Sequence, residues 1–235
     1  MGQNMDLKIL QKAWACRDCR APHEFETFRP EGGYHKFPPV IGKQQDADIL
    51  FVGLKPRRSD SNLVLHESIM GDFGKFADLA KNRVNGKPYI GEPRQEEHYR
   101  FHYEVTEAIY GHRVPFENYA AVTELWLCAA LDKHGLPKNT DGSIRRNREC
   151  RENFLLGTVE RIKPVVIIAL GRFVVENLLK NPPERLLREG EIAECSFGGR
   201  RQFVIHAPHP GGGFSWRARD NVAEKTRSCL QDRCR

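Results

Sequence analysis

Four apolar stretches stand out along the chain, and each is bounded by acidic residues, glycine, proline or other turn formers. Short apolar runs with such flanks are typical of strands that are buried on both faces of a parallel sheet. The run PVVIIALG is the clearest of them. The predicted strands are Asp46–Leu54, Tyr119–Leu127, Pro164–Gly171 and Arg200–Pro210.

Between these strands, apolar residues recur with the three- and four-residue spacing of amphipathic helices. The predicted helices are Phe73–Arg83, Glu96–Gly111, Arg148–Lys163, Arg172–Asn181 and Ser215–Gln231. Strands separated by helices predict an α/β fold, in which a parallel sheet has helices on both faces. No repeat, low-complexity stretch or linker divides the 235 residues, so we expect a single domain over residues 1–235.

Ligands of such folds bind outside the carboxyl ends of the strands. The loops that follow the predicted strands are therefore the expected place of a site. These loops are Leu54–Asp72, Glu124–Cys128, Gly171–Arg172 and His206–Trp216.

Four of the seven cysteines suggest a metal site. Cys16 and Cys19 form a C-x-x-C pair, whereas Cys128 and Cys150 stand alone further along the chain. Four thiolates are the usual ligands of a [4Fe-4S] cluster and of many zinc sites. If the four meet, they fasten an N-terminal cysteine arm to the middle of the domain; the alternative is that they are ordinary buried thiols. The remaining cysteines are interpreted as incidental: Cys195, Cys229 and Cys234.

The formal net charge is +6 and the sequence pI about 9.0, which permits a polyanionic partner without requiring one. The chain has no apolar run long enough to cross a membrane, and its first residues lack the features of a signal peptide. We therefore expect a cytoplasmic protein with no membrane partner, and in that compartment disulfides rarely explain cysteines.

Several motifs follow one another in a fixed order: ILFVGLKP, SIMGDFGKF, AVTELWLCAA, IKPVVIIALG and VIHAPHP. Together with the cysteines, they resemble the uracil-DNA glycosylase superfamily, and more narrowly its iron–sulfur families 4 and 5. The broad-specificity family 5 is the closer of the two, because G-L-x-P at Gly53–Pro56 is followed by Asn62 and by Gly71-Asp72. The resemblance extends from Cys16 to Pro210.

The resemblance implies a three-layer αβα fold around a central four-stranded parallel sheet. It implies a monofunctional DNA glycosylase, which excises uracil or another deaminated base by hydrolysis of the N-glycosidic bond in base excision repair. The implied partner is DNA with a damaged base, and the implied protein is a monomer in the cytoplasm of a bacterium or archaeon. The implied cofactor is a structural [4Fe-4S] cluster, and its ligands are Cys16, Cys19, Cys128 and Cys150.

The resemblance also implies catalytic residues. Asp72 takes the position of the catalytic carboxylate, His209 that of the motif histidine, and Asn62 that of a loop residue near the reacting sugar. The chemistry agrees, because cleavage of the bond leaves a cationic sugar and an anionic base. A carboxylate can orient water and stabilise the sugar, and a histidine can donate to the base.

Residues of the base-binding loops depart from the family pattern at several positions. Lys55, which follows Gly53 and Leu54, stands where members of families 4 and 5 usually have a small residue. The aromatic residue expected before Gly71-Asp72 is absent, and Phe73 could replace it. Glu124 stands where family 4 has an asparagine that reads the base. These departures leave the preferred base open.

A target base must leave the helical stack before it can react. The loop PHPGGGFSW offers glycines and an apolar tip beside arginines, an arrangement known from proteins that kink DNA. Its predicted DNA-contacting residues are Phe214, Trp216 and Arg217.

Other interpretations stay open. Asp72 before Phe73 is also a good helix N-cap, and His206 competes with His209 for the histidine position. The alternative function is a non-catalytic DNA-binding or damage-sensing protein on the same fold. A third is a zinc-stapled domain that acts on a small nucleotide.

Overall fold

The computed structural model describes residues 11–13, 41–43, 45–54, 72–74, 93–111, 118–125, 151–179, 188, 190–209 and 216–232. These residues form a mixed α/β fold around one sheet, whose strand order is β1-β3-β2-β4-β6-β5. The strands are β1 (Ile41–Gly42), β2 (Ile49–Gly53), β3 (Ala120–Glu124), β4 (Val166–Leu170), β5 (Ile192–Phe197) and β6 (Arg200–Ala207). The predicted α/β fold with a largely parallel sheet is confirmed.

Each of the four predicted strands is present, and the four run parallel to one another in the order β3-β2-β4-β6. The sheet extends beyond these four central strands, because β1 and β5 pair in antiparallel fashion with β3 and β6 and bring the sheet of the described residues to six strands. Strand β1 is two residues long, too short for a periodic pattern. Strand β5 does alternate, with Ala193, Cys195 and Phe197 less exposed than the residues between them.

The helices of the described residues are α4 (Pro93–Tyr110), the π-helical turn η3 (Arg151–Leu155), α6 (Leu156–Ile162), α7 (Arg172–Leu178) and α8 (Trp216–Asp232). They coincide with four of the predicted helices to within a few residues, and η3 continues directly into α6. Of the helix predicted over Phe73–Arg83, the described residues include only Phe73 and Gly74, which are helical.

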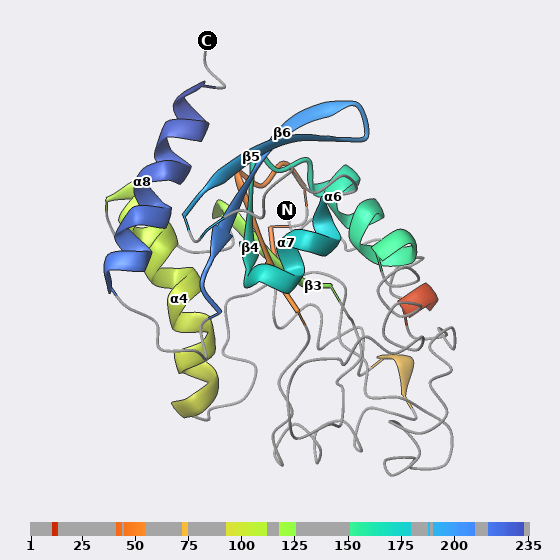
Figure 1. Cartoon of the computed structure of the whole chain (residues 1–235). Helices are drawn as coiled ribbons and strands as arrows, with labels where there is room; N and C mark the ends of the chain where they lie inside the picture. The colour runs from red at the N-terminus through yellow and green to blue at the C-terminus, as the bar shows by residue number, and fades with distance from the viewer. Residues whose placement is uncertain are drawn as a thin grey trace.

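Two apolar layers enclose the sheet, because alternate residues of each central strand face opposite sides. In β4, Ile167 and Ala169 join the core cluster formed with α6 and α7. Val166, Ile168 and Leu170 join the cluster formed with α4 and α8. All five residues are buried, which explains the continuous apolar run of this strand. Figure 1 shows α4 and α8 side by side on one face and α6 and α7 on the other.

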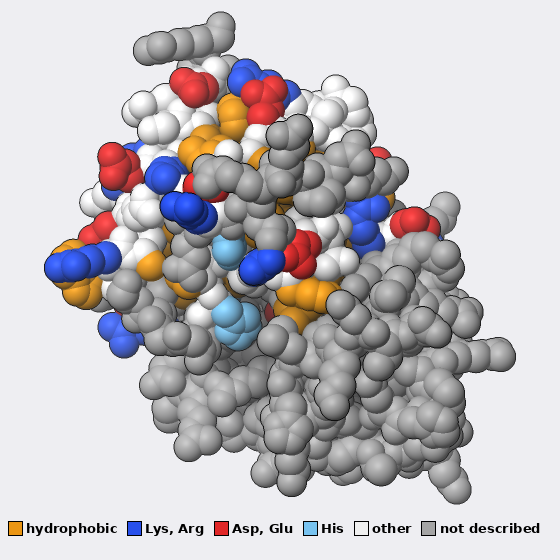
Figure 2. Space-filling view, viewed as in Figure 1, with side chains coloured by type: hydrophobic (Ala, Val, Ile, Leu, Met, Phe, Trp, Pro, Cys, Tyr) orange, Lys and Arg blue, Asp and Glu red, His pale blue; other side chains and the backbone are white. Residues whose placement is uncertain are grey.

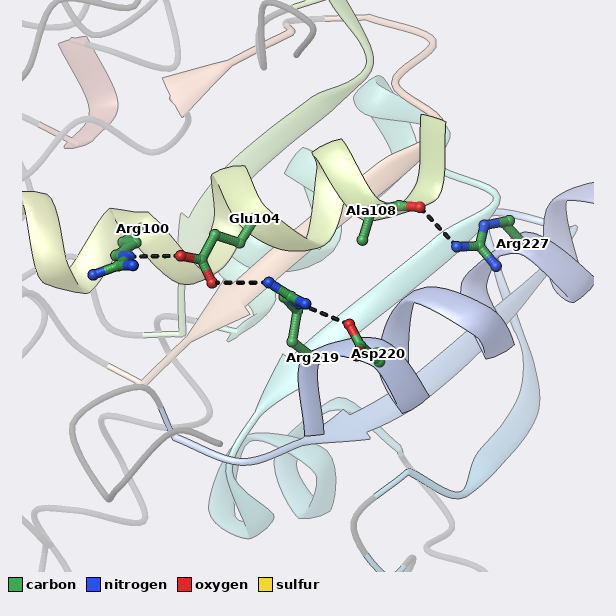
Figure 3. Close-up of polar contacts among 6 residues, drawn as sticks. All are labelled: Arg100, Glu104, Ala108, Arg219, Asp220 and Arg227. Atoms are coloured by element: carbon green, nitrogen blue, oxygen red, sulfur yellow. Dashed lines mark hydrogen bonds and ion pairs between the residues drawn. The ribbon is translucent and has the colours of Figure 1, made fainter. Parts of the chain in front are cut away.

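Polar contacts join α4 to α8 at two places (Figure 3). Glu104 pairs with Arg100 on its own helix at 2.5 Å and with Arg219 of α8 at 3.6 Å, and Arg219 also binds Asp220. Further along, Arg227 donates to the carbonyl oxygens of Ala108 (2.7 Å) and Ile109 (3.2 Å) at the end of α4. A cation at a helix C-terminus satisfies carbonyls that lack an intrahelical partner, so α8 caps α4.

Candidate functional site

The four parallel strands end at the same edge of the sheet, and predicted site residues lie at or just after the ends of β2, β3 and β6. The register pairs Gly53 of β2 with Glu124 of β3, and Leu170 of β4 with Ala207 of β6. Gly171 follows β4 directly, and His209 comes two residues after β6. Ligands of parallel α/β sheets bind at this edge, so it is the candidate site.

The carboxylate of Glu124 lies directly against the Cα atom of Gly53. A Cβ atom added at residue 53 would stand 2.0 Å from Oε2 of Glu124 and 2.8 Å from its Cδ. The Oε2 atom is buried, although the residue as a whole is half-buried. Glycine at 53 therefore makes room for the Glu124 carboxylate. Leu54 is a core residue with 7% exposure, which leaves its backbone as the part that can contact a ligand.

His209 lies beside the turn that joins β4 to α7. Gly171 adopts a φ of +95°, a conformation that favours glycine, and its amide donates to the carbonyl oxygen of Ala207 at 2.8 Å. A Cβ atom at residue 171 would stand 3.8 Å from Cβ of His209. His209 is exposed, whereas its competitor His206 is 6% exposed within β6. Of the two, His209 is the one whose ring can reach a substrate from solvent.

Asp72 is exposed and precedes the half-buried Phe73. One carboxylate oxygen, Oδ1, is 3.0 Å from the place of a Cβ atom on Gly74, so the side chain folds back over the start of a helical segment. This geometry suits a helix N-cap, and exposure leaves the carboxylate accessible to a ligand as well. Two further predicted site residues, Asn62 and Lys55, lie outside the described residues.

The predicted DNA-contacting residues begin helix α8. Trp216 is 64% exposed, and the Arg217 guanidinium lies 5.4 Å from the centre of its ring. Arg219, one turn later, is engaged with Glu104 and Asp220. Arg217 is therefore better able than Arg219 to meet a phosphate. Phe214 lies outside the described residues. Figure 2 shows Lys and Arg (blue) and His (pale blue) side chains exposed on the face that is viewed.

The four predicted cluster ligands, Cys16, Cys19, Cys128 and Cys150, lie outside the described residues. Within the described ranges, no group of three or more His, Cys, Asp or Glu residues is arranged to hold a metal ion. Two described segments near these positions in the sequence, residues 11–13 and residues 151–155, contact each other.

Lys12 lies four residues before Cys16, and it donates to Oδ1 of Asn153 at 3.1 Å. Its ammonium group is also 5.7 Å from the ring centre of Phe154. Asn153 comes three residues after Cys150. The segment that precedes Cys16 thus contacts the turn η3, which follows Cys150. Leu125, three residues before Cys128, and Leu155, five residues after Cys150, both lie in the core cluster on the α6 and α7 side of the sheet.

Two other cysteines, Cys195 and Cys229, lie within the described residues, and both are at least partly buried. Burial raises the pKa of Cys195 to about 12 and that of Cys229 to about 11. Both groups therefore stay protonated near neutral pH, where a metal ligand or nucleophile must be a thiolate. This supports their interpretation as incidental cysteines.

Comparison with models of protein families and with curated proteins finds no match. No helix of the described part has the length and apolar character needed to cross a membrane. The site must therefore be interpreted from its own residues.

Proposed function

We propose that this protein is a monofunctional DNA glycosylase of the uracil-DNA glycosylase type, which removes uracil or another deaminated base from DNA by hydrolysis. The observation that carries the proposal is the meeting of Gly53 with Glu124, and of Gly171 with His209, at one edge of the sheet. The four central strands and their two helical layers support a fold of the same type. The proposed partner is DNA, the proposed state a monomer and the proposed compartment the cytoplasm.

In this proposal His209 donates a hydrogen bond to the base as negative charge develops on it. Its exposure at the sheet edge allows an approach from solvent, and its Cβ atom lies beside the Gly171 turn. Asp72 orients the attacking water and stabilises the cationic sugar, for which an accessible carboxylate is required. Trp216 and Arg217 provide an exposed aromatic surface and a cation for the unstacked DNA strand.

The cysteine site belongs to the same proposal. The contacts of Lys12 with Asn153 and Phe154 support the approach of the C-x-x-C segment to Cys150. Four thiolates suit a [4Fe-4S] cluster. As proposed, the cluster is structural: it joins distant segments and takes no part in hydrolysis.

A panel of oligonucleotides tests the function. Each duplex and single strand contains one modified base, such as uracil, hypoxanthine or xanthine, and alkaline cleavage reveals the abasic site. We expect cleavage of at least one deaminated base and none of the unmodified strand. Tight binding of a damaged duplex without cleavage would show that the protein senses damage and is not a glycosylase. Cleavage of free nucleosides alone would favour a nucleotide-acting domain.

The carboxylate of Glu124 at the candidate site leads us to expect weak activity on uracil. An ionised carboxylate only accepts hydrogen bonds, so it cannot donate to a carbonyl oxygen, and it repels an anionic leaving base. Replacing Glu124 with asparagine should raise the single-turnover rate on uracil by roughly tenfold, which corresponds to about 1.4 kcal/mol in the barrier. Glu194→Gln, at an exposed carboxylate on β5, is the matched control and should leave the rate unchanged. An equal or lower rate in Glu124→Asn would show that this carboxylate does not meet the base.

A further inference from the structure

Helices α4 and α8 run in the same direction along one face of the sheet, because their successive contacts advance together along both helices (Figure 3). The end of α4 lies at the edge where the parallel strands begin, since the Tyr110 hydroxyl donates at 2.8 Å to Oδ2 of Asp48, which directly precedes β2. The 18 residues of α4 extend about 27 Å. The first turns of both helices therefore lie toward the opposite edge, where the candidate site is.

Two exposed aromatic side chains lie in the first halves of these helices. Among the described residues, the large apolar side chains that are exposed are Tyr103, Ile192 and Trp216. Tyr103 is 42% exposed and directly precedes Glu104 on α4. Trp216 comes one helical turn before Arg219, the residue of α8 that meets Glu104. Both aromatic residues thus flank the same contact between the helices, which sets this surface apart from a scatter of single apolar residues.

Three arginines accompany the aromatic residues. Arg217 lies over the Trp216 ring, and the Arg100 side chain is 73% exposed. Arg219 pairs with Glu104 at 3.6 Å and with Asp220 at 2.8 Å, and Glu104 also pairs with Arg100. Among these charged groups, three cations face two carboxylates, so the surface has an excess of positive charge.

The chemistry of these groups suits a nucleic-acid strand. A planar guanidinium binds phosphate through two parallel N–H groups. An exposed arginine can exchange a carboxylate for a phosphate at little cost, because exposed ion pairs contribute little to stability. Aromatic side chains beside such cations are the surfaces on which unpaired bases stack.

We propose that the first halves of α4 and α8 form a DNA-binding surface that continues the candidate site onto this helical layer. Arg100 and Arg217 bind phosphates, and Tyr103 and Trp216 stack on unpaired bases. Glu104 occupies Arg100 in the free protein and gives way to a phosphate, so it lowers the affinity for DNA. The inference rests on the proposed function, because it takes DNA as the partner. It adds the path of the strand, which crosses α4 and α8 rather than α6 and α7.

The test measures the affinity of the full-length chain for labelled, undamaged single-stranded and duplex DNA by fluorescence anisotropy, over a series of salt concentrations. Arg100→Gln should weaken binding about fivefold, the upper range for one exposed ion pair. It should also reduce the slope of log K against log salt by about one. Glu104→Gln should tighten binding about threefold, because it releases two arginines. Tyr103→Ala should affect the single strand more than the duplex, because only unpaired bases can stack.

The matched control is another exposed ion pair, Arg201 with Glu194, at 2.8 Å. Arg201 lies near the start of β6, and this eight-residue strand extends about 26 Å toward the candidate site. That separation exceeds the Debye length of about 8 Å at physiological salt. Arg201→Gln and Glu194→Gln should therefore bind DNA as the wild type does. Thermal unfolding is measured for every variant, and Arg217→Gln decides if a change at the contact between α4 and α8 lowers stability.

Three outcomes would disprove this surface. In the first, Arg100→Gln and Glu104→Gln bind DNA as the wild type does. In the second, the control pair shifts the affinity equally, so that net charge alone explains the effect. In the third, the wild type binds neither form of DNA. Excision on the oligonucleotide panel is a separate readout. Binding that depends on Arg100 without excision of any base would support the surface and disprove the glycosylase, whereas excision with unchanged binding in the Arg100 variant would do the reverse.

Discussion

Replacing His209 with alanine should lower the single-turnover rate of base excision by about 10²–10³-fold, the usual cost of removing one donor from a developing anion. The effect should appear in the chemical step, because the contact strengthens as charge moves onto the base. The dissociation constant for DNA should stay within a few-fold of wild type, since phosphate contacts supply most of the affinity. Glu224→Ala, an exposed position on α8, is the control.

Asp72→Ala completes this test, because it removes the carboxylate that is proposed to orient the attacking water and to stabilise the cationic sugar. It should also slow excision on bound DNA and leave binding intact. Wild-type excision by His209→Ala would remove the main catalytic assignment. If Asp72→Ala lowered thermal stability but not the rate, its N-cap geometry over Gly74 would be its whole role.

Substituting Cys150 or Cys128 with alanine should abolish iron binding and the brown colour of anaerobically purified protein. The variants should also unfold at a lower temperature, because a metal site that joins distant segments contributes its binding free energy to folding. Iron and sulfide analysis, visible absorption and thermal unfolding measure the effect. Cys195→Ala is the control, because its protonated thiol accepts no metal near neutral pH.

Other metal contents would change the assignment. If the wild-type protein is colourless and contains one zinc per chain, the bound metal is zinc instead of a [4Fe-4S] cluster, and the four cysteines remain its ligands. Iron retained at the wild-type level in both Cys128→Ala and Cys150→Ala would disprove the tetrad itself.

The sequence predicts most of the described fold, because β2 and β4 are apolar along their whole length and buried on both faces. Residues 166–170 could be assigned from their apolar run alone. The edge strands were missed for different reasons. Strand β1 is too short to show a periodic pattern of apolar residues. In β5, Ala193, Cys195 and Phe197 alternate with more exposed residues, and a Gly198-Gly199 turn follows, so a search for two-residue periodicity could have found this strand.

The candidate site was predictable as a set of loops but not as a set of contacts. That Glu124 lies near the end of a strand is visible in the sequence. That its carboxylate occupies the space left by Gly53 depends on the register between β2 and β3, which no local pattern encodes. The surface on α4 and α8 shows the same limit, because the contact between Glu104 and Arg219 depends on how two helices that are distant in the sequence pack together.

The place of α8 at the end of the described chain has a consequence for synthesis on the ribosome. Val222, Ala223 and Cys229 of α8 share a core cluster with Ile168 and Ile205, so a nascent chain that stops short of residue 216 leaves part of that face of the sheet exposed to water, with α4 alone to cover it. Strand β6, which pairs with β4, also comes late. We therefore expect the domain to complete its core only after residues 216–232 have left the ribosome, with earlier intermediates exposing apolar surface that chaperones bind.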